Sequence, residues 1–182
     1  MGIADNVRNA VVGAVQGAGD VGVALVDSVT RVATETLQGA GQVGGTALKV
    51  PTELVSTALK SAAEVGATGA EATQKVVSSI VQAVSGSAVD TEQGIRDVAQ
   101  QTVKTAQETG QDVGSAGVAA VRGSVEAVQS VGGDVGKATE AAVVGAIDGA
   151  KEVSEDAVQA VASSIETSVD GARDIVKRVV GK

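Results

Sequence analysis

The side chains of this chain that could do chemistry are carboxylates, amides, hydroxyls and amines. The 182 residues include 22 Asp and Glu and 14 Lys and Arg, but no His, no Cys and no aromatic residue. The commonest general base, the thiolate nucleophile and most transition-metal ligands are therefore missing. No GxGxxG or GxxxxGK[ST] loop joins a strand pattern to a helix pattern. We expect no enzymatic activity, no metal site and no bound cofactor.

The polar side chains are spread along the chain rather than gathered at one place. One column, taken every 22 residues, is polar throughout: Gln16, Gln38, Lys60, Gln82, Lys104, Glu126, Asp148 and Asp170. A column that keeps the same position in each repeat predicts a solvated stripe along amphipathic helices. These elements position the polar groups for solubility and contact rather than for catalysis.

The charge pattern excludes several partners. The net charge is −8, Lys and Arg stand singly, and no aromatic ring is present for base stacking, which argues against nucleic-acid binding. The longest uncharged stretch, 76–89, is too short and too polar to span a bilayer. The first residues carry no basic and apolar leader pattern. We expect a cytoplasmic protein that is not transmembrane, with a peripheral position on a lipid or granule surface as the alternative.

The strongest signal is an internal repeat of 22 residues that needs no insertion or deletion from end to end. Three columns of the repeat are apolar in every copy, and together they form the predicted apolar interface. The first column is Val11, Ala33, Val55, Val77, Ala99, Val121, Val143 and Ile165. The second is Val15, Leu37, Leu59, Val81, Val103, Val125, Ile147 and Val169. The third is Ala18, Ala40, Ala62, Val84, Ala106, Val128, Ala150 and Ala172.

The spacing within each repeat indicates a helix. Each 22-mer divides into two 11-mers, whose apolar residues recur at intervals of three and four. Eleven residues make three turns at about 3.67 residues per turn, so the apolar stripe runs nearly straight or drifts into a right-handed supercoil. A β-solenoid with a 22-residue coil is the competing interpretation because Val is abundant, but strict alternation is absent. The fold class that we predict is all-α, with eight repeats in a single domain, 1–182.

Three places in the chain have residues that break helices. They are Gly44-Gly45 followed by Pro51 (44–51), Ser85-Gly86-Ser87 before the capping-box pattern Asp90 to Gln93 (85–90), and Gly132-Gly133 (132–134). Long amphipathic helices, extended or paired in a right-handed coiled-coil-like assembly, are the first expectation. A helical hairpin or an up-down four-helix bundle is the alternative, and disorder in isolation is a third.

Glycine and the small apolar residues leave two interpretations open. The chain has 24 Gly, and pairs such as Gly145 and Gly149 have GxxxG spacing. They indicate either close approach of helix backbones or a weakly helical chain that orders on binding. An apolar face of Ala and Val, without aromatic residues, stabilises a lone compact fold only marginally. We therefore expect the chain to pack with copies of itself.

The repeat resembles those of known amphipathic-helix proteins. Gly17 to Val23 and Val143 to Lys151 resemble the perilipin type, and Lys104 to Gln111 resembles the 11-mer of late-embryogenesis-abundant proteins. Exchangeable apolipoproteins and synucleins share the pattern. The resemblance implies a helix that coats a lipid or another apolar surface, or one that folds on drying. The excess of acids and the continuous apolar face depart from these proteins and favour a permanently buried face.

Three functions follow, and the sequence leaves all three open. The first is a non-enzymatic structural protein whose apolar face packs in a homo-oligomer such as a stalk, tube or filament. The second is an amphipathic-helix coat of a lipid or other apolar surface. The third is a desiccation or stress protectant. The plainest alternative to all three is that the apolar face is the core of an ordinary helical bundle.

Overall fold

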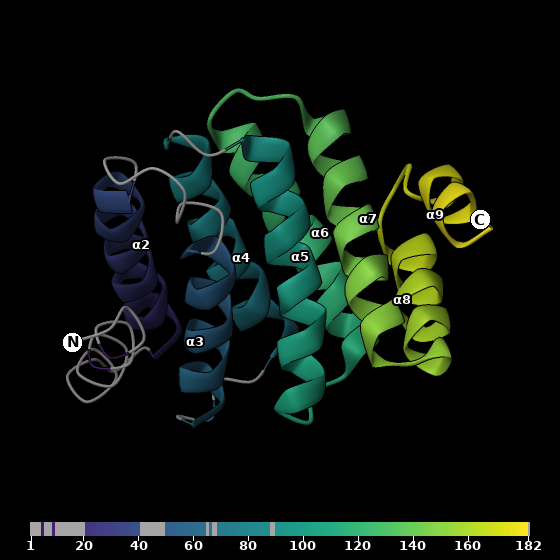
Figure 1. The fold of residues 1–182 in the computed structure, drawn as a ribbon, viewed down its shortest axis with the longest axis horizontal. Helices are drawn as coiled ribbons and strands as arrows, with labels where there is room; N and C mark the ends of the chain where they lie inside the picture. Colours follow the sequence, from purple (N-terminus) through teal and green to yellow (C-terminus); the bar gives the residue numbers. More distant parts are fainter. Residues whose placement is uncertain are drawn as a thin grey trace.

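The structure is a computed structural model that describes residues 5, 9, 21–40, 50–64, 66, 69–87 and 90–181. In these ranges the protein is a stack of helices without strands (Figure 1), so the prediction of an all-α repeat protein is confirmed. The helices are α2 (Val21–Ala40), α3 (Val50–Glu64), α4 (Ala70–Ser85), α5 (Thr91–Glu108), α6 (Val113–Ser130), α7 (Val135–Val153), α8 (Glu155–Ser168) and α9 (Arg173–Val180).

Each 22-residue repeat in the middle of the chain forms one helix and one turn. Helices α5, α6 and α7 begin at Thr91, Val113 and Val135, which occupy the same position in consecutive repeats. Of the arrangements that the sequence left open, the structure has the folded-back one. Our first expectation of extended helices does not hold for the described residues, because the chain reverses at each repeat instead of at three breaks.

The turns explain why the helices stop. Gly110 and Gly132 have φ of +71° and +73°, the left-handed conformation that glycine adopts at low cost. At the first of these turns, the Gly110 N–H donates to the Gln107 carbonyl and the Gln111 N–H donates to the Ala106 carbonyl. This pair of hydrogen bonds is a Schellman motif, which satisfies the last carbonyls of a helix.

An aspartate two residues after each of these glycines starts the next helix. The Asp112 carboxylate accepts a hydrogen bond from the Ser115 N–H at 2.6 Å, and the Asp134 carboxylate accepts one from the Lys137 N–H at 3.1 Å. Each carboxylate satisfies an N–H that the helix itself leaves free. The short sequence from glycine to aspartate therefore ends one helix and begins the next.

The predicted breaks at 85–90 and 132–134 lie between consecutive helices, while the break at 44–51 lies mostly outside the described residues. The helix start predicted at Asp90 is confirmed, because its carboxylate accepts from the Gln93 N–H at 2.8 Å and α5 begins at Thr91. The Gln93 side chain donates to Asp97 at 2.7 Å, so the reciprocal half of a capping box is not formed. Pro51 is the second residue of α3, where its missing N–H would have no helical partner anyway.

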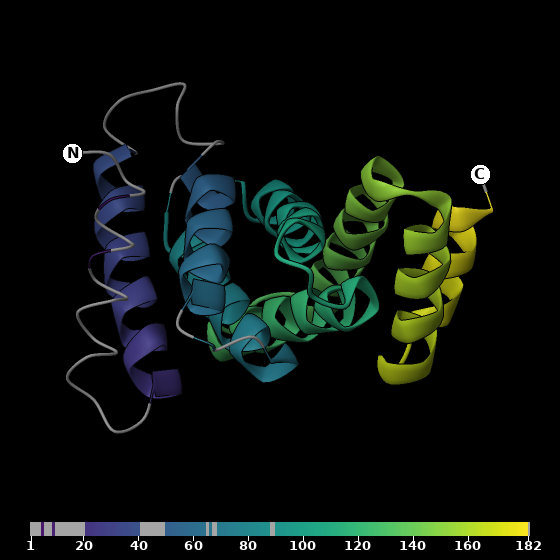
Figure 2. The same ribbon diagram turned by 90° about the horizontal axis from the view of Figure 1, so that it is seen from below.

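The helices form two layers along the long axis of the molecule. Each helix packs on the next one and on the one after that, so α2, α4, α6 and α8 lie side by side in one layer and α3, α5, α7 and α9 in the other. Figures 1 and 2 show this stack running from α2 at one end to α8 and α9 at the other. Two consecutive 22-residue repeats thus build one structural unit of two helices, one in each layer.

Glycine allows neighbouring helices of one layer to approach closely. A Cβ at Gly145 in α7 would overlap the carbonyl oxygen of Arg96 in α5, and a Cβ at Gly123 in α6 would lie 2.5 Å from the carbonyl oxygen of Gln74 in α4. Gly123 and Gly145 belong to the same column of the repeat. The interpretation of glycine as a site of close backbone approach therefore describes these helices.

Polar side chains also link neighbouring helices of one layer across the surface. Lys60 of α3 pairs with Glu108 of α5 at 2.8 Å, and Lys104 of α5 pairs with Glu152 of α7 at 2.6 Å. The two pairs are related by two repeats, so the same contact recurs along one layer. The polar column predicted as a solvated stripe also joins helices to one another.

Candidate functional site

The predicted apolar interface lies inside the single chain. Val11, Val15, Ala18 and the side chain of Ala40 lie outside the described residues. Val125 and Val169 are partly buried. The others are all buried: Ala33, Leu37, Val55, Leu59, Ala62, Val77, Val81, Val84, Ala99, Val103, Ala106, Val121, Val128, Val143, Ile147, Ala150, Ile165 and Ala172. We call these buried and partly buried residues the seam.

The seam is covered by the chain's own helices, so its residues form one core. Further residues that the sequence analysis left out complete this core, among them Val76, Ile80, Ile95 and Val98. Val76, Ile80 and Val98 stand next to seam residues in the sequence, and Ile95 lies one helical turn before Ala99. Counting a wider helical face would have found them. Buried hydroxyls are satisfied locally: Thr102 donates to the carbonyl of Val98 at 2.7 Å.

The charged groups of the described residues make ion pairs between helices and within them. No group of His, Cys, Asp or Glu that could hold a metal ion occurs among the described residues. The hydrogen bonds from Lys104 and then Gln100 lower the pKa of Glu152. Burial raises the pKa of Asp97, against the opposing effects of Gln93 and Arg96. Each shift has a structural cause in helix packing.

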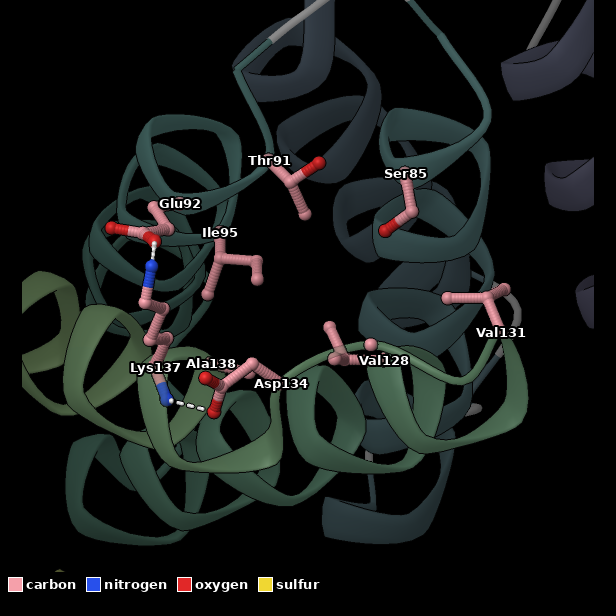
Figure 3. Close-up of a pocket in the computed structure, with 10 residues that line it drawn as sticks. Ser85, Thr91, Glu92, Ile95, Val128, Val131, Asp134, Lys137 and Ala138 are labelled. Atoms are coloured by element: carbon pink, nitrogen blue, oxygen red, sulfur yellow. Dashed lines mark hydrogen bonds and ion pairs between the residues drawn. The ribbon is translucent and has the colours of Figure 1, made fainter.

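One concave site lies at the turns between helices and has an apolar floor. This open pocket of about 330 Å³ is bordered by the ends of α4 and α6 and the beginnings of α5 and α7 (Figure 3). Its floor includes Ile95, Val128 and Ala138, which are almost fully buried. Val131 is 53% exposed and also lines the cavity. We call this the turn pocket.

The rim of the turn pocket is polar. The Lys137 ammonium lies 3.2 Å from the Glu92 carboxylate, and these side chains join α7 to α5 (Figure 3). The hydrogen bond and the charge of Glu92 raise the pKa of Lys137. The carboxylate of Asp134 at the rim caps α7. An apolar floor with a few polar groups suits binding of a small apolar group, and the pocket shows no nucleophile paired with a base.

Sequence reasoning did not find the turn pocket. Ile95 and Val131 lie outside the three apolar columns, and the pocket arises where two turns come together in space. The only sequence signal is a Val at the end of α6, directly before Gly132-Gly133. That signal does not indicate a cavity without the fold.

Comparison with known proteins shows a similarity of fold. No protein family model matches the chain, and no curated protein is similar to it. Among solved structures, it is similar to the crystal structure of the de novo designed helical repeat protein DHR7, with a TM-score of 0.54 and 17% sequence identity. The match covers 98% of this chain and 95% of that chain. By its fold, the chain therefore belongs to the class of helical repeat proteins.

None of the helices in the described ranges is both long and apolar enough to cross a bilayer.

Proposed function

We propose that the chain is a non-enzymatic structural protein, a helical-repeat scaffold that offers its polar outer surface and the turn pocket to partners. The observation that supports this most is the burial of the seam, with Val77, Val103 and Ile147 at 0% exposed. A scaffold must fold before it meets a partner, and a seam covered by the chain's own helices provides that. A cytoplasmic location is part of the same proposal.

Self-assembly through the seam, which we expect from the sequence, would require the helices to separate. The seam residues of α5 and α7 already pack within one chain. A homo-oligomer that keeps this fold would have to use other surfaces. The scaffold is therefore our first candidate function, ahead of a stalk or filament built on the seam.

Light scattering after size-exclusion chromatography, combined with circular dichroism, tests the scaffold. We expect a mass of 17.7 kDa at micromolar concentration and a helical spectrum that does not change on dilution. A cooperative thermal melt should follow, because a buried core melts as a unit. Helicity that is lost on dilution, together with a larger mass at high concentration, would favour the seam-mediated oligomer instead.

A coat for an apolar surface is the second candidate, and the composition of the core supports it. The buried residues are mostly Val and Ala, and the largest fully buried side chains are Leu and Ile. Such a core gains less from burial than one with aromatic residues. If the helices separate, the seam becomes a continuous apolar face suited to lipid, as the resemblance to perilipins and apolipoproteins implies.

A cross-link tests the coat, because it can prevent the helices from separating. Since the chain has no Cys, Lys104→Cys with Glu152→Cys can be joined by a short bis-maleimide. We expect flotation with neutral lipid particles to be lost on cross-linking if lipid binding needs opened helices. Lys104→Cys with Glu108→Cys, both in α5, is the matched control that joins no two helices. Absence of flotation for the unmodified protein rejects the coat.

A further inference from the structure

The turn between α6 and α7 exposes apolar side chains that the preceding turn does not. Val131 and Val135 are both exposed here. One repeat earlier, Thr109 stands at the position of Val131, and its hydroxyl donates to the Thr105 carbonyl at 2.8 Å. Val113 stands at the position of Val135 and packs against the core. Val131 has no hydroxyl with which to cap its helix, and it leaves an apolar side chain at the mouth of the turn pocket.

The turn pocket is open because of the residues at the start of α5. In the other layer, a Cβ at Gly117 in α6 would lie only 2.8 Å from the side chain of Val161 in α8, and Gly114 approaches α8 as closely. The residues one repeat before these two glycines are Ile95 and Glu92. Side chains of this size hold the start of α7 away from α5, so a pocket lies where α6 and α8 are in direct contact.

The size of the pocket indicates what it can hold. Its volume of about 330 Å³ lies at the lower end of the range for small-molecule sites, about 300–1,000 Å³. It is roughly twice the volume of an apolar cavity of about 150 Å³ that holds one benzene molecule, so it has room for about a dozen non-hydrogen atoms. A single side chain of a partner protein would fill only part of it. A small molecule suits the pocket better.

Carboxylates outnumber amines at the rim of the pocket. Glu92, Asp134 and Lys137 line it, which gives two negative charges and one positive charge. The hydrogen bond and the charge of Glu92 raise the pKa of Lys137, and the charges of Asp134 and Asp90 also raise it. Lys137 therefore lies in a negative field. A ligand that brings a further positive charge is attracted to this rim, and an anion is repelled.

We propose that the turn pocket binds a small organic cation with a hydrocarbon part, such as an alkylammonium ion. The hydrocarbon lies against Ile95, Val128 and Val131, and the ammonium group lies at the rim, near the carboxylates of Glu92 and Asp134. This proposal rests on the proposed function, because the pocket exists only when the chain folds as one stack, and it names the chemistry of one partner of the scaffold.

Two ions with the same hydrocarbon chain, octylammonium and octanoate, test the charge. Each is titrated into the full chain, and methyl resonances of Val and Ile are followed by nuclear magnetic resonance. We expect octylammonium to shift the resonances of Ile95, Val128 and Val131 to saturation at millimolar concentration. Octanoate should bind at least about fivefold more weakly, as expected for exposed charges. Equal or tighter binding of octanoate, or shifts spread evenly over the seam, overturns the proposal.

Filling the pocket tests its location. Ser85→Leu places an apolar side chain in the pocket from the end of α4 (Figure 3). Octylammonium binding should weaken at least about tenfold, which corresponds to losing the burial of about two methylene groups. Gln107→Leu is the matched control, because Gln107 occupies the same position one repeat later, is exposed, and lies outside the pocket. Equal binding by these two variants places the ligand elsewhere and rejects the site.

A change of charge at the rim tests the recognition of the cation. Glu92→Gln leaves Lys137 without its carboxylate, so octylammonium should bind more weakly, octanoate more tightly, and the preference should disappear. Glu140→Gln is the control, because Glu140 also pairs with a cation on another helix, Arg178 at 2.9 Å, but does not line the pocket. This variant should keep the preference. An equal change in both variants would mean that only the overall charge matters, which contradicts the proposal.

Mass and helicity of the same samples separate this proposal from the scaffold itself. A helical monomer that binds neither ion overturns the cation site and leaves the scaffold standing. A chain that is helical only as an oligomer overturns both, since the pocket belongs to the monomer's own stack.

Discussion

The turns before and after α7 differ, although the apolar columns continue through both. Before α7, Gly132 takes a positive φ and a Schellman motif ends α6. The same column has Ser154 after α7, with φ of −171° and ψ of 167°. There α7 continues to Val153 and α8 begins at Glu155, so a single residue separates the helices. Without the glycine, the chain turns through an extended serine.

This difference shows that two signals in the sequence act separately. The apolar columns decide which side of each helix is buried, and the glycine and aspartate between them decide where each helix ends. Ser154 replaces both turn residues, because its hydroxyl accepts from the Ala157 N–H at 3.1 Å and so caps α8. The regular region, α5 to α7, keeps both signals in register, and the C-terminal region, α8 and α9, keeps only the first.

The largest expected loss of stability comes from a substitution at Gly145 in the regular region. Thr167 of α8 occupies the same column one repeat later and is the matched position for comparison. Gly145→Ala places a methyl group on the Arg96 carbonyl oxygen, so α5 and α7 must move apart at a cost of about 3 kcal/mol. Thr167 is exposed, and Thr167→Ala should change stability by no more than about 0.5 kcal/mol. Urea unfolding measures both. Equal effects would show that the two regions do not differ in helix approach.

The turn column itself gives the next effect. Gly132→Ala forces a side chain into the left-handed region and should destabilise the protein by about 1–2 kcal/mol. Gly86→Ala is the control, because Gly86 has φ of −90° and a methyl group there would make only ordinary van der Waals contacts, at 3.7 Å or more. Ser154→Gly should cost only a few tenths of a kcal/mol, since glycine is a tolerated N-cap. A loss for Ser154→Gly as large as that for Gly132→Ala would contradict the contrast between the turns.

The N-cap aspartates contribute less. Asp112→Ala removes the acceptor for the Ser115 N–H and should cost about 1 kcal/mol at neutral pH. That hydrogen bond lowers the pKa of Asp112 from its ordinary 3.8. Its stabilisation is therefore complete above pH 3.8 and is lost as the pH falls through the lower folded pKa. Thermal melts should show the unchanged protein approaching Asp112→Ala in acid, and a constant gap between them would count against this.

The recurring ion pair has the smallest effect. Lys104 and Glu152 are partly exposed, so their interaction should be worth about 0.2–1 kcal/mol and should weaken with salt. A double-mutant cycle with Lys104→Ala and Glu152→Ala measures it. The cycle for Arg178→Ala and Glu140→Ala, at the C-terminal region, should give a similar value. A coupling above about 2 kcal/mol at either place would mean that the pair stabilises the fold more than an exposed ion pair can.

Much of the fold could be predicted from the sequence because the repeat signal is strong. The apolar columns gave the buried side of each helix, and Val103 and Ile147 are both fully buried. The turn at Gly110 was missed because the glycines were interpreted as sites of close helix approach or as a weakness of the helix. Recognising a glycine followed two residues later by Asp112 would have placed that turn.

The candidate site was harder to predict for a physical reason. The turn pocket combines Ile95 of α5 with Val128 of α6, which come together only because two turns lie side by side. The apolar columns also gave no sign that α8 would end at Ser168 and that the chain would fold back into α9, since these columns continue to Ala172. Such features depend on which helices become neighbours, and a periodic pattern describes one helix at a time.

The central claim is that the chain covers its own seam, and one distance tests it most directly. Spin labels at Lys104→Cys and Glu152→Cys, in protein diluted with unlabelled copies, report the separation of α5 and α7 within one chain by pulsed electron paramagnetic resonance. The two side chains are in contact in the folded stack, so we expect a narrow distribution below about 25 Å, given neighbouring helices about 10 Å apart and the reach of two labels. A single extended helix would separate these positions by about 70 Å, and a distribution centred there would contradict the account.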